Sequence, residues 1–321
     1  MTRAPLIDAF LARSGWDTAV RHPLAGDASA RRYIRLIAQD GAQAMLMDAP
    51  PETGEDTAPF VRVARHLARA GFSAPAILDW DEPAGLILME DLGDGLVSAI
   101  CAEDQGHEPM IYAATARMLA ALHLEPVPEW ADRYDPPRMA EMLGPFHEYA
   151  VPMNRGGISD MERAMEDTLR AHALADPVLI LRDFHAENLL WLPERDGHAR
   201  IGLLDFQDAL AGDPTYDLAS LFQDARRDVS AEASRAATEA FCDATGHSHD
   251  AVVAGVAVQG AQRNLRILGI FARLTRAGKP KYAPLVPRVE HHLAACLAHP
   301  ACTDLRRALA RAAPGYLAVH A

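Results

Sequence analysis

The pattern of apolar and polar positions predicts strands in the first ninety residues and helices in most of the remainder. After a short amphipathic segment at the start, the stretches 31–36 and 44–47 read as two strands around a turn near Asp40. A helix is predicted over 58–70, followed by strands over 76–80 and 85–89. Beyond residue 96 the apolar positions recur at helical spacing, which predicts several helices: 96–125, 139–149, 159–173, 214–224, 228–244 and 256–274.

The stretch from Val178 to Leu221 contains the polar residues that could take part in catalysis or ligand binding. Two apolar runs, 178–181 and 201–204, read as buried strands, and the first is followed by Asp183 and the second by Asp205. Asn188 lies between the runs. This spacing predicts a hairpin-like pair of strands that brings the three side chains to one cleft. Two carboxylates and an amide can hold a hard cation through oxygen and leave one carboxylate as a base, as phosphoryl transfer from a magnesium nucleotide requires.

Three blocks in this stretch resemble a known family. They are Asp183-x-His185-x-x-Asn188, then Leu204-Asp205-Phe206, then Asp213-Pro214-x-Tyr216-Asp217-Leu218-Ala219. Their order and spacing are similar to the aminoglycoside phosphotransferase and choline-kinase-like branch of the protein-kinase fold. The resemblance implies an α+β, two-lobed protein-kinase-like fold, with a small β-rich N-lobe and a larger, mostly helical C-lobe. We expect the N-lobe, a nucleotide-covering sheet with a helix, to span 1–93 and the C-lobe, with the catalytic loop, metal site and acceptor pocket, to span 94–321.

The resemblance also implies a role for individual residues, with ATP and Mg²⁺ as the expected cofactors. Asp183 would be the catalytic base, and His185 would brace the catalytic loop beside it. Asn188 and Asp205 would hold the metal, and Asp217 would support the loop by bonding its backbone amides. The residues expected to bind the nucleotide are Ser29, Arg31, Arg32, Met89, Glu90 and Leu92, and those expected to contact the acceptor are Glu187 and Arg155.

One departure from the kinase pattern concerns the lysine expected on the third strand and its glutamate partner. The strand ends Met45-Leu46-Met47-Asp48, the chain's two lysines are Lys279 and Lys281, and the next helix carries arginines but no glutamate. Two interpretations follow. The protein is a non-catalytic pseudokinase, or an arginine replaces the lysine, since guanidinium suits phosphate oxygens. The intact set around Asp183 favours an arginine, with five candidates: Arg31, Arg32, Arg62, Arg65 and Arg69.

Three further segments narrow the resemblance: 26–33, 47–51 and 262–274. They are similar to the bacterial subgroup that phosphorylates the anomeric hydroxyl of N-acetylmuramate or N-acetylglucosamine in peptidoglycan recycling. The last segment carries Arg263, Arg266 and Arg273 on an apolar helix, either as basic groups on the cleft side or as solvated arginines. The alternative acceptors are an aminoglycoside, choline or another amino alcohol, and a nucleotide-binding regulator without turnover is a further alternative.

Composition limits the classes of protein that remain. With 321 residues, half of them apolar and a net charge of −13, the chain fits a globular protein and lacks the basic character of a general nucleic-acid binder. Its four cysteines are scattered, which indicates free thiols rather than a disulfide framework or a zinc site. We expect no signal peptide in the first residues, and no run in the sequence is long and apolar enough to span a membrane. We therefore expect a cytoplasmic protein that binds neither nucleic acid nor a membrane, and the resemblance implies a protein, expected to be a monomer, that binds ATP and a small sugar.

Overall fold

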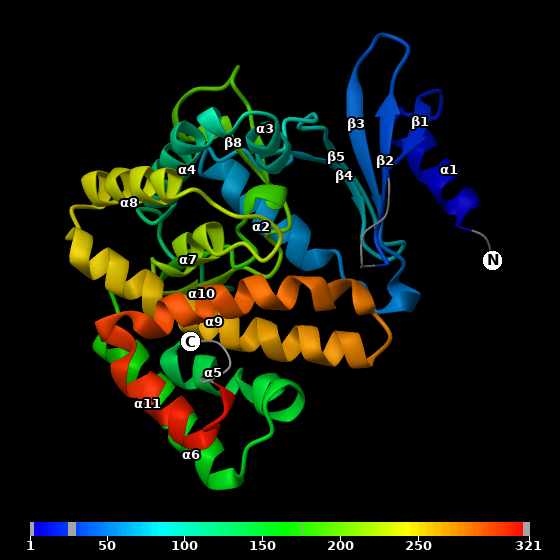
Figure 1. The fold of residues 1–321 in the computed structure, drawn as a ribbon. Coiled ribbons are helices and arrows are strands. Elements are labelled where there is room, and N and C mark those ends of the chain that lie inside the picture. The colour runs from blue at the N-terminus through cyan, green and yellow to red at the C-terminus, as the bar shows by residue number, and fades with distance from the viewer. Residues whose placement is uncertain (1–2, 25–29, 175, 317–321) are drawn as a thin grey trace. The chain divides into compact units, whose positions relative to one another are not determined.

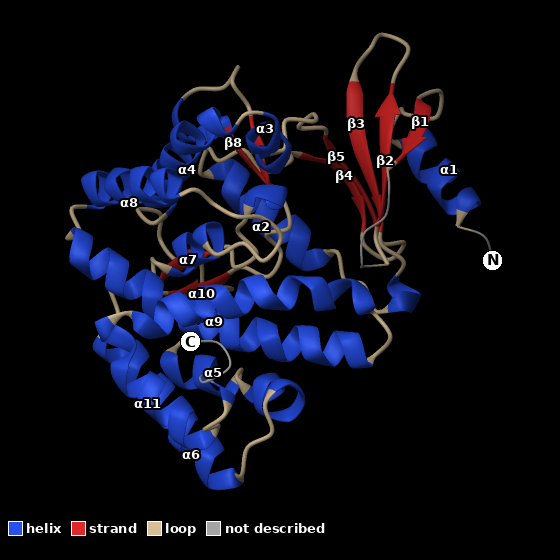
Figure 2. Cartoon of the chain, viewed as in Figure 1, coloured by secondary structure: helices blue, strands red, loops and turns tan. Residues whose placement is uncertain are grey.

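The computed structural model describes residues 3–24, 30–174 and 176–316. The chain forms two compact units, the first made of Met1–Ala99 with Glu187–Asp208, and the second of Ile100–Ala186 with Ala209–Ala321. Most strands belong to the first unit and most helices to the second (Figure 2). The expected assignment of a nucleotide lobe to 1–93 and an acceptor lobe to 94–321 stays a prediction.

The first unit is built on a five-stranded antiparallel sheet with the strand order β1-β2-β3-β5-β4 (Figure 1). A separate hairpin, β7–β8, completes the unit. The elements are α1 (Ala4–Arg13), β1 (Val20–Pro23), β2 (Arg32–Ile37), β3 (Gln43–Asp48), α2 (Ala58–Arg69), β4 (Ile77–Asp81), β5 (Leu86–Glu90), β7 (Leu189–Trp191) and β8 (Ile201–Leu203), with α3 (Val97–Glu103) beginning at its end.

Strand periodicity divides the large sheet into two faces with different tasks. Because successive side chains point to opposite faces, Leu36, Leu46 and Leu88 share one face, where they pack with Phe10 and Leu11 of α1 in a buried cluster. The other face carries the row Arg35, Met45 and Met89, which lie opposite one another on β2, β3 and β5. The first face is therefore closed by a helix, and the second is left to line a cavity.

The second unit is mostly helical and is organised around the long helix α9 (His249–Arg276). Its other elements are α4 (Glu108–Leu122), α5 (Pro136–Glu141), α6 (Arg155–Ala171), β6 (Val178–Ile180), β9 (Leu210–Gly212), α7 (Tyr216–Phe222), α8 (Ala231–Thr245), α10 (Val286–Ala298) and α11 (Thr303–Ala312). Apolar residues of α9 such as Val258 and Leu265 are fully buried in its core. None of the helices in the described ranges has the length and hydropathy needed to cross a membrane.

A glycine allows an unusually close approach of backbone to α9. A side chain added at Gly269 would overlap the backbone of Pro145 and Phe146, where the chain forms a single π-helical turn over Phe146–Ala150. Only a residue without Cβ lets the two backbones meet at this point. The segment after α5 is thereby held against the C-terminal half of the long helix.

The strand pairing predicted around the central stretch is wrong. The run at 178–181 supplies β6, which pairs with β9, whereas β8 pairs with β7. The apolar residues Leu189–Trp191 form a strand of their own, and the polar turn after them makes a local hairpin with β8. A local hairpin has the shorter loop to close, which favours this pairing over the more distant one.

Candidate nucleotide pocket and catalytic loop

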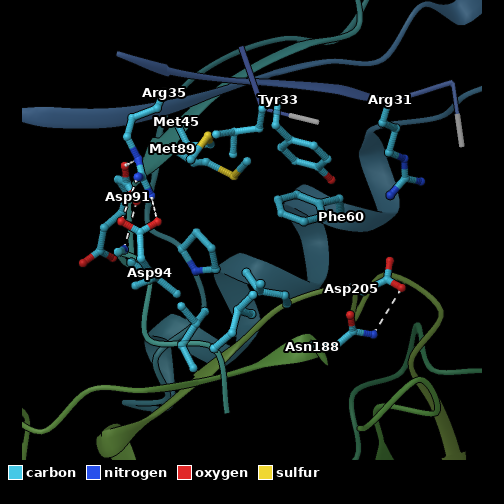
Figure 3. A pocket seen from close by; sticks show the side chains of 18 of the residues that line it. Arg31, Tyr33, Arg35, Met45, Phe60, Met89, Asp91, Asp94, Asn188 and Asp205 are labelled. Carbon is cyan, nitrogen blue, oxygen red and sulfur yellow. Dashed lines mark hydrogen bonds and ion pairs between the residues drawn. The ribbon is translucent and has the colours of Figure 1, made fainter. Parts of the chain in front are cut away.

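A cavity of about 550 Å³ lies within the first unit (Figure 3). This size is in the usual range for a small-molecule or cofactor site. Its lining residues are Leu24, Arg31, Tyr33, Arg35, Met45, Phe60, Pro75, Met89, Glu90, Asp91, Leu92, Gly93, Asp94, Leu96, Asn188, Leu190, Leu204, Asp205 and Gln207. The middle of the cavity is apolar and both of its ends are charged, so it suits a ligand with a flat apolar body and a polar group at each side.

The sheet provides the apolar wall through the row that faces away from α1. Met45 and Met89 lie opposite one another on neighbouring strands, and Leu190 of β7 lines the same cavity. Phe60 on α2 adds an aromatic ring, which stacks on Phe206 with 4.9 Å between ring centres. These side chains offer a planar ligand contact surfaces without competing hydrogen bonds.

One charged end is formed by Arg35 and two aspartates of the segment after β5. The Arg35 guanidinium donates hydrogen bonds to the buried carboxylate of Asp91 and to Asp94, the latter at 2.8 Å. These bonds raise the pKa of Arg35 and hold the pKa of Asp94 below its ordinary value. Asp91 also accepts the backbone N–H of Gly93, whose φ of 83° is in the left-handed region. The ion pairs fix the segment in which Met89, Glu90 and Leu92 were predicted to bind a nucleotide.

The other charged end contains Arg31, Asn188 and Asp205 (Figure 3). The Asn188 amide lies 3.4 Å from one carboxylate oxygen of Asp205, and Gln207 donates to the other oxygen at 2.8 Å. Asp205 adopts a φ of 53°, a conformation that costs free energy for a residue other than glycine. The strained backbone therefore sets the direction of this carboxylate, as is common where a side chain must point at a ligand.

The donor set at this end fits a magnesium ion that is carried by phosphates. Mg²⁺ is usually bound by one or two carboxylates together with water and substrate phosphates. Asp205 supplies a carboxylate, and Asn188 supplies an amide oxygen. In the described ranges no group of three or more His, Cys, Asp or Glu side chains forms a metal cage. A cation here would thus depend on oxygen ligands brought by the nucleotide.

Of the five arginines that could replace the missing strand lysine, Arg31 is the one that lines the pocket. Its guanidinium bonds Glu55 at 2.7 Å, and both side chains are 16% exposed. Burial lowers the pKa of Arg31, but the bond to Glu55 and nearby charges including Asp205 outweigh it, so the net shift is upward. The other candidates for the missing lysine, Arg32, Arg62, Arg65 and Arg69, do not line this cavity. Ser29, also predicted to bind the nucleotide, lies outside the described residues.

The predicted catalytic loop begins in the second unit, where Asp217 anchors it. The buried Asp217 carboxylate accepts the backbone N–H groups of Leu181 and Arg182 at 2.7 and 2.9 Å. Arg182 has a φ of 68°, and its carbonyl accepts the Ser220 hydroxyl at 3.1 Å. Two bonds thus hold the strained Arg182, which immediately precedes Asp183, and a third holds Leu181 before it.

Burial sets the protonation of two residues around this loop. Burial raises the pKa of Asp217 to about 7, against the two backbone bonds that lower it. His185 is 5% exposed, and burial together with the charges of Arg226 and Arg263 lowers its pKa to about 3. His185 is therefore neutral at physiological pH, with Nε2 3.2 Å from the Arg226 guanidinium. A neutral imidazole has one N–H group, whereas a protonated one has two. The His185 ring can therefore brace the loop, but it does not carry the extra proton that would make it a general acid.

The two residues predicted to contact the acceptor lie on exposed parts of the chain. Glu187 is exposed in the short turn that precedes β7, and Arg155 is exposed at the first position of α6. Their roles stay predictions. Sequence reasoning missed several pocket residues, namely Tyr33, Arg35, Met45, Phe60 and Gln207. For Tyr33, Arg35 and Met45 the signal was available, because strand alternation places them on the face opposite the Leu36 row.

Comparison with known proteins identifies the family. A model of the phosphotransferase enzyme family matches residues 20–255. The chain belongs to this family. The phosphotransferase is 37% identical to the N-acetylmuramate/N-acetylglucosamine kinase of Caulobacter vibrioides, and the alignment covers 93% of each chain.

Solved structures show the fold of this phosphotransferase. A choline/ethanolamine kinase family protein from Mesorhizobium loti matches with a TM-score of 0.68 at 18% identity, covering 96% of this chain and 99% of that one. A structure of LicA in complex with AMP matches with a TM-score of 0.61 at 15% identity, covering 91% and 98%. The predicted family and the protein-kinase-like fold class are confirmed.

Proposed function

We propose that this phosphotransferase transfers the γ-phosphoryl group of ATP to the anomeric hydroxyl of N-acetylmuramate or N-acetylglucosamine. The products are ADP and the sugar 1-phosphate. The observation that carries the proposal is the near-full-length similarity to the Caulobacter kinase of these two sugars. The charged and apolar zones of the pocket supply independent support for the nucleotide half of the reaction.

The pocket chemistry suggests one orientation for ATP. The adenine ring would lie between Met45, Met89 and Phe60, and its edge would bond the backbone of residues 90–92. The triphosphate would extend towards Arg31 and Asp205, where a guanidinium suits phosphate oxygens. Arg31 would thus take the place of the missing strand lysine.

Asn188 and Asp205 would hold Mg²⁺ on the phosphates. Such an ion neutralises the charge that develops on the transferred phosphoryl group. In the absence of a strand lysine, this neutralisation and the charge of Arg31 would together offset the triphosphate. The loss of a metal-binding residue or of Arg31 should therefore reduce turnover more than it reduces the free energy of unfolding.

Asp183 would act as the base of the reaction. Its carboxylate accepts the proton of the anomeric hydroxyl, the hydroxyl oxygen forms a bond to the γ-phosphorus, and the bond from that phosphorus to the β–γ bridging oxygen breaks to release ADP. Asp217 and His185 would position Asp183 through the loop. Glu187 and Arg155 are retained as proposed contacts to the acceptor.

The test is a substrate panel with product detection. The purified protein is incubated with ATP and magnesium chloride together with N-acetylmuramate, N-acetylglucosamine, choline or an aminoglycoside, and phosphorus NMR detects the product. A new sugar 1-phosphate signal with equimolar ADP is expected for the two amino sugars. Phosphorylation of the amines alone would overturn the acceptor, and ATP binding without any product would overturn the activity itself.

We also propose that the enzyme works in the cytoplasm as a monomer, on small molecules rather than on nucleic acid or a membrane. Four free cysteines, three of them buried, support a reducing compartment. The net charge of −13 supports the exclusion of nucleic acid. Light scattering of the purified protein at working concentration tests the monomer, and a dimer mass would refute it.

A further inference from the structure

Helix α9 carries a polar stripe on a face that is otherwise used for the core. Gln259, Gln262, Arg263 and Arg266 recur three and four residues apart, which places them on one face of the helix. Gln262 and Arg263 are buried, and each donates to a backbone carbonyl, Gln262 to Met139 at 2.8 Å and Arg263 to Gln223 at 3.2 Å. These two side chains have structural partners that account for their burial.

Arg266 differs from its neighbours on the stripe. It is half-buried, yet it forms no hydrogen bond or ion pair with any residue that the structure describes. Its positive charge acts on Tyr134, which is 2% exposed and is also affected by a hydrogen bond with Gln262, one turn before Arg266. Burial and Tyr216 raise the pKa of Tyr134, whereas the charges of Arg266 and Arg182 lower it. Two guanidinium groups therefore act on one phenol, and no described carboxylate forms an ion pair with Arg266.

The position of this cluster relates it to the predicted catalytic loop. The Arg182 guanidinium lies over the Tyr134 ring, 5.6 Å from its centre, and Arg182 directly precedes Asp183. One turn beyond Arg266, Gly269 meets the backbone of Pro145 and Phe146. Arg266 thus lies on α9 between the loop that carries the proposed base and the segment after α5, all within the second unit.

A half-buried cation beside a second cation is costly unless an anion compensates it. No described carboxylate forms an ion pair with Arg266, so an anionic ligand could supply its partner. Of the two proposed acceptors, N-acetylmuramate carries a carboxylate and N-acetylglucosamine is neutral. Guanidinium binds carboxylate with charge-assisted hydrogen bonds in a fixed geometry.

We propose that Arg266 is a specificity-determining residue that binds the carboxylate of an acidic sugar acceptor. The inference rests on the proposed function, because it assigns one residue to one of its two acceptors. The inference predicts that Arg266 of α9 contributes to the binding of N-acetylmuramate and not to the binding of N-acetylglucosamine. The exposed Arg273, seven residues further along the same helix, is not expected to contribute.

The experiment compares Arg266→Met with the matched control Arg273→Met on both sugars. For Arg266→Met we expect the KM for N-acetylmuramate to rise about tenfold or more, as for the loss of a charge-assisted hydrogen bond, and the KM for N-acetylglucosamine to change less than about twofold. Arg273→Met should leave both values near those of the wild type. Equal effects on the two sugars, or no effect on either, would overturn the inference.

Binding measured without turnover separates this inference from the proposed function. Calorimetric titration of each sugar into the nucleotide-free wild type and Arg266→Met should show a selective loss of the acid. If the wild type phosphorylates neither sugar, the proposed function fails, and titration still decides: selective loss of the acid supports the role of Arg266, and absence of binding to the wild type refutes it. If Arg266→Met does not fold, Arg266→Lys replaces it, with a smaller rise in KM expected for the acid alone.

Discussion

The carboxylate of Asp217 accepts the backbone N–H of Arg182 at 2.9 Å while it is completely buried. Arg182 has a left-handed backbone conformation, so the bond stabilises a residue that sequence alone would not favour there. The same burial raises the pKa of the carboxyl from its ordinary value of 3.8 to about 7. The loop before Asp183 is thus tied to a group that titrates near neutral pH.

The first prediction concerns the pH dependence of stability. Because the folded-state pKa of Asp217 is raised, its contribution to the free energy of unfolding is fully present below 3.8 and is lost as pH rises through about 7. One proton changes that free energy by at most about 1.4 kcal/mol per pH unit. Asp217→Asn should lack this component, so denaturant titrations of both proteins across this range should diverge as pH rises. Parallel curves would contradict the raised pKa.

The second prediction concerns the base. Asp183→Asn removes the proton acceptor without changing the shape of the side chain, so kcat should fall about 10²- to 10⁴-fold. Thermal unfolding should remain close to that of the wild type, because Asp183 is only half-buried. Asp196→Asn, at a fully exposed turn position, is the matched control and should retain activity. Near-normal turnover by folded Asp183→Asn would remove it from the proposed role.

The third prediction concerns the replacement of the strand lysine. Arg31→Met should raise the KM for ATP about tenfold or more, because the positive charge next to the phosphates is lost. Arg32→Met, one residue further along but exposed and outside the pocket lining, should have little effect. The measurement is steady-state kinetics with ATP as the varied substrate. An effect of Arg32→Met equal to or larger than that of Arg31→Met would reverse the assignment.

The fourth prediction concerns packing on α9. Gly269→Ala would force a methyl group into the backbone of Pro145 and Phe146, and we expect a loss of about 1–3 kcal/mol in the free energy of unfolding. Gly144→Ala is the control, because an added Cβ there has no atom within 4 Å. Denaturant unfolding followed by circular dichroism compares the two variants. The conclusion fails if both variants unfold at the same midpoint as the wild type.

Local patterns were sufficient for much of the fold. The hairpin of β2 and β3, the strand β5 and the helix α2 follow from strand alternation and helical spacing within short windows. The pairing of β6 with β9 could not be predicted in the same way. Residues 210–212 are Leu-Ala-Gly, too short and too small to read as a strand, and the partner was therefore assigned to the wrong apolar run.

The site shows the same division between local and non-local information. Motif spacing pointed to Asn188 and Asp205, which lie together in the pocket. The sequence could not single out Arg31, because Arg31 and Arg32 were both expected to bind the nucleotide and three helix arginines were further candidates, whereas in the structure Arg31 is the one of these five that lines the cavity. The ion pairs of Arg35 with Asp91 and Asp94 join residues far apart in the chain. No local pattern encodes such a pair.

The composition of the first unit also has a consequence for synthesis in the cell. Its sheet and its first two helices are complete by Glu90, yet Asn188, Leu190, Leu204, Asp205 and Gln207 complete the lining of its pocket. A nascent chain that has just left the ribosome with its first hundred residues therefore exposes apolar surface that β7 and β8 later cover. The pocket proposed for the nucleotide is therefore complete only once translation has passed Gln207, and a fragment cut after Ala99 would have a sheet without the full lining of that pocket.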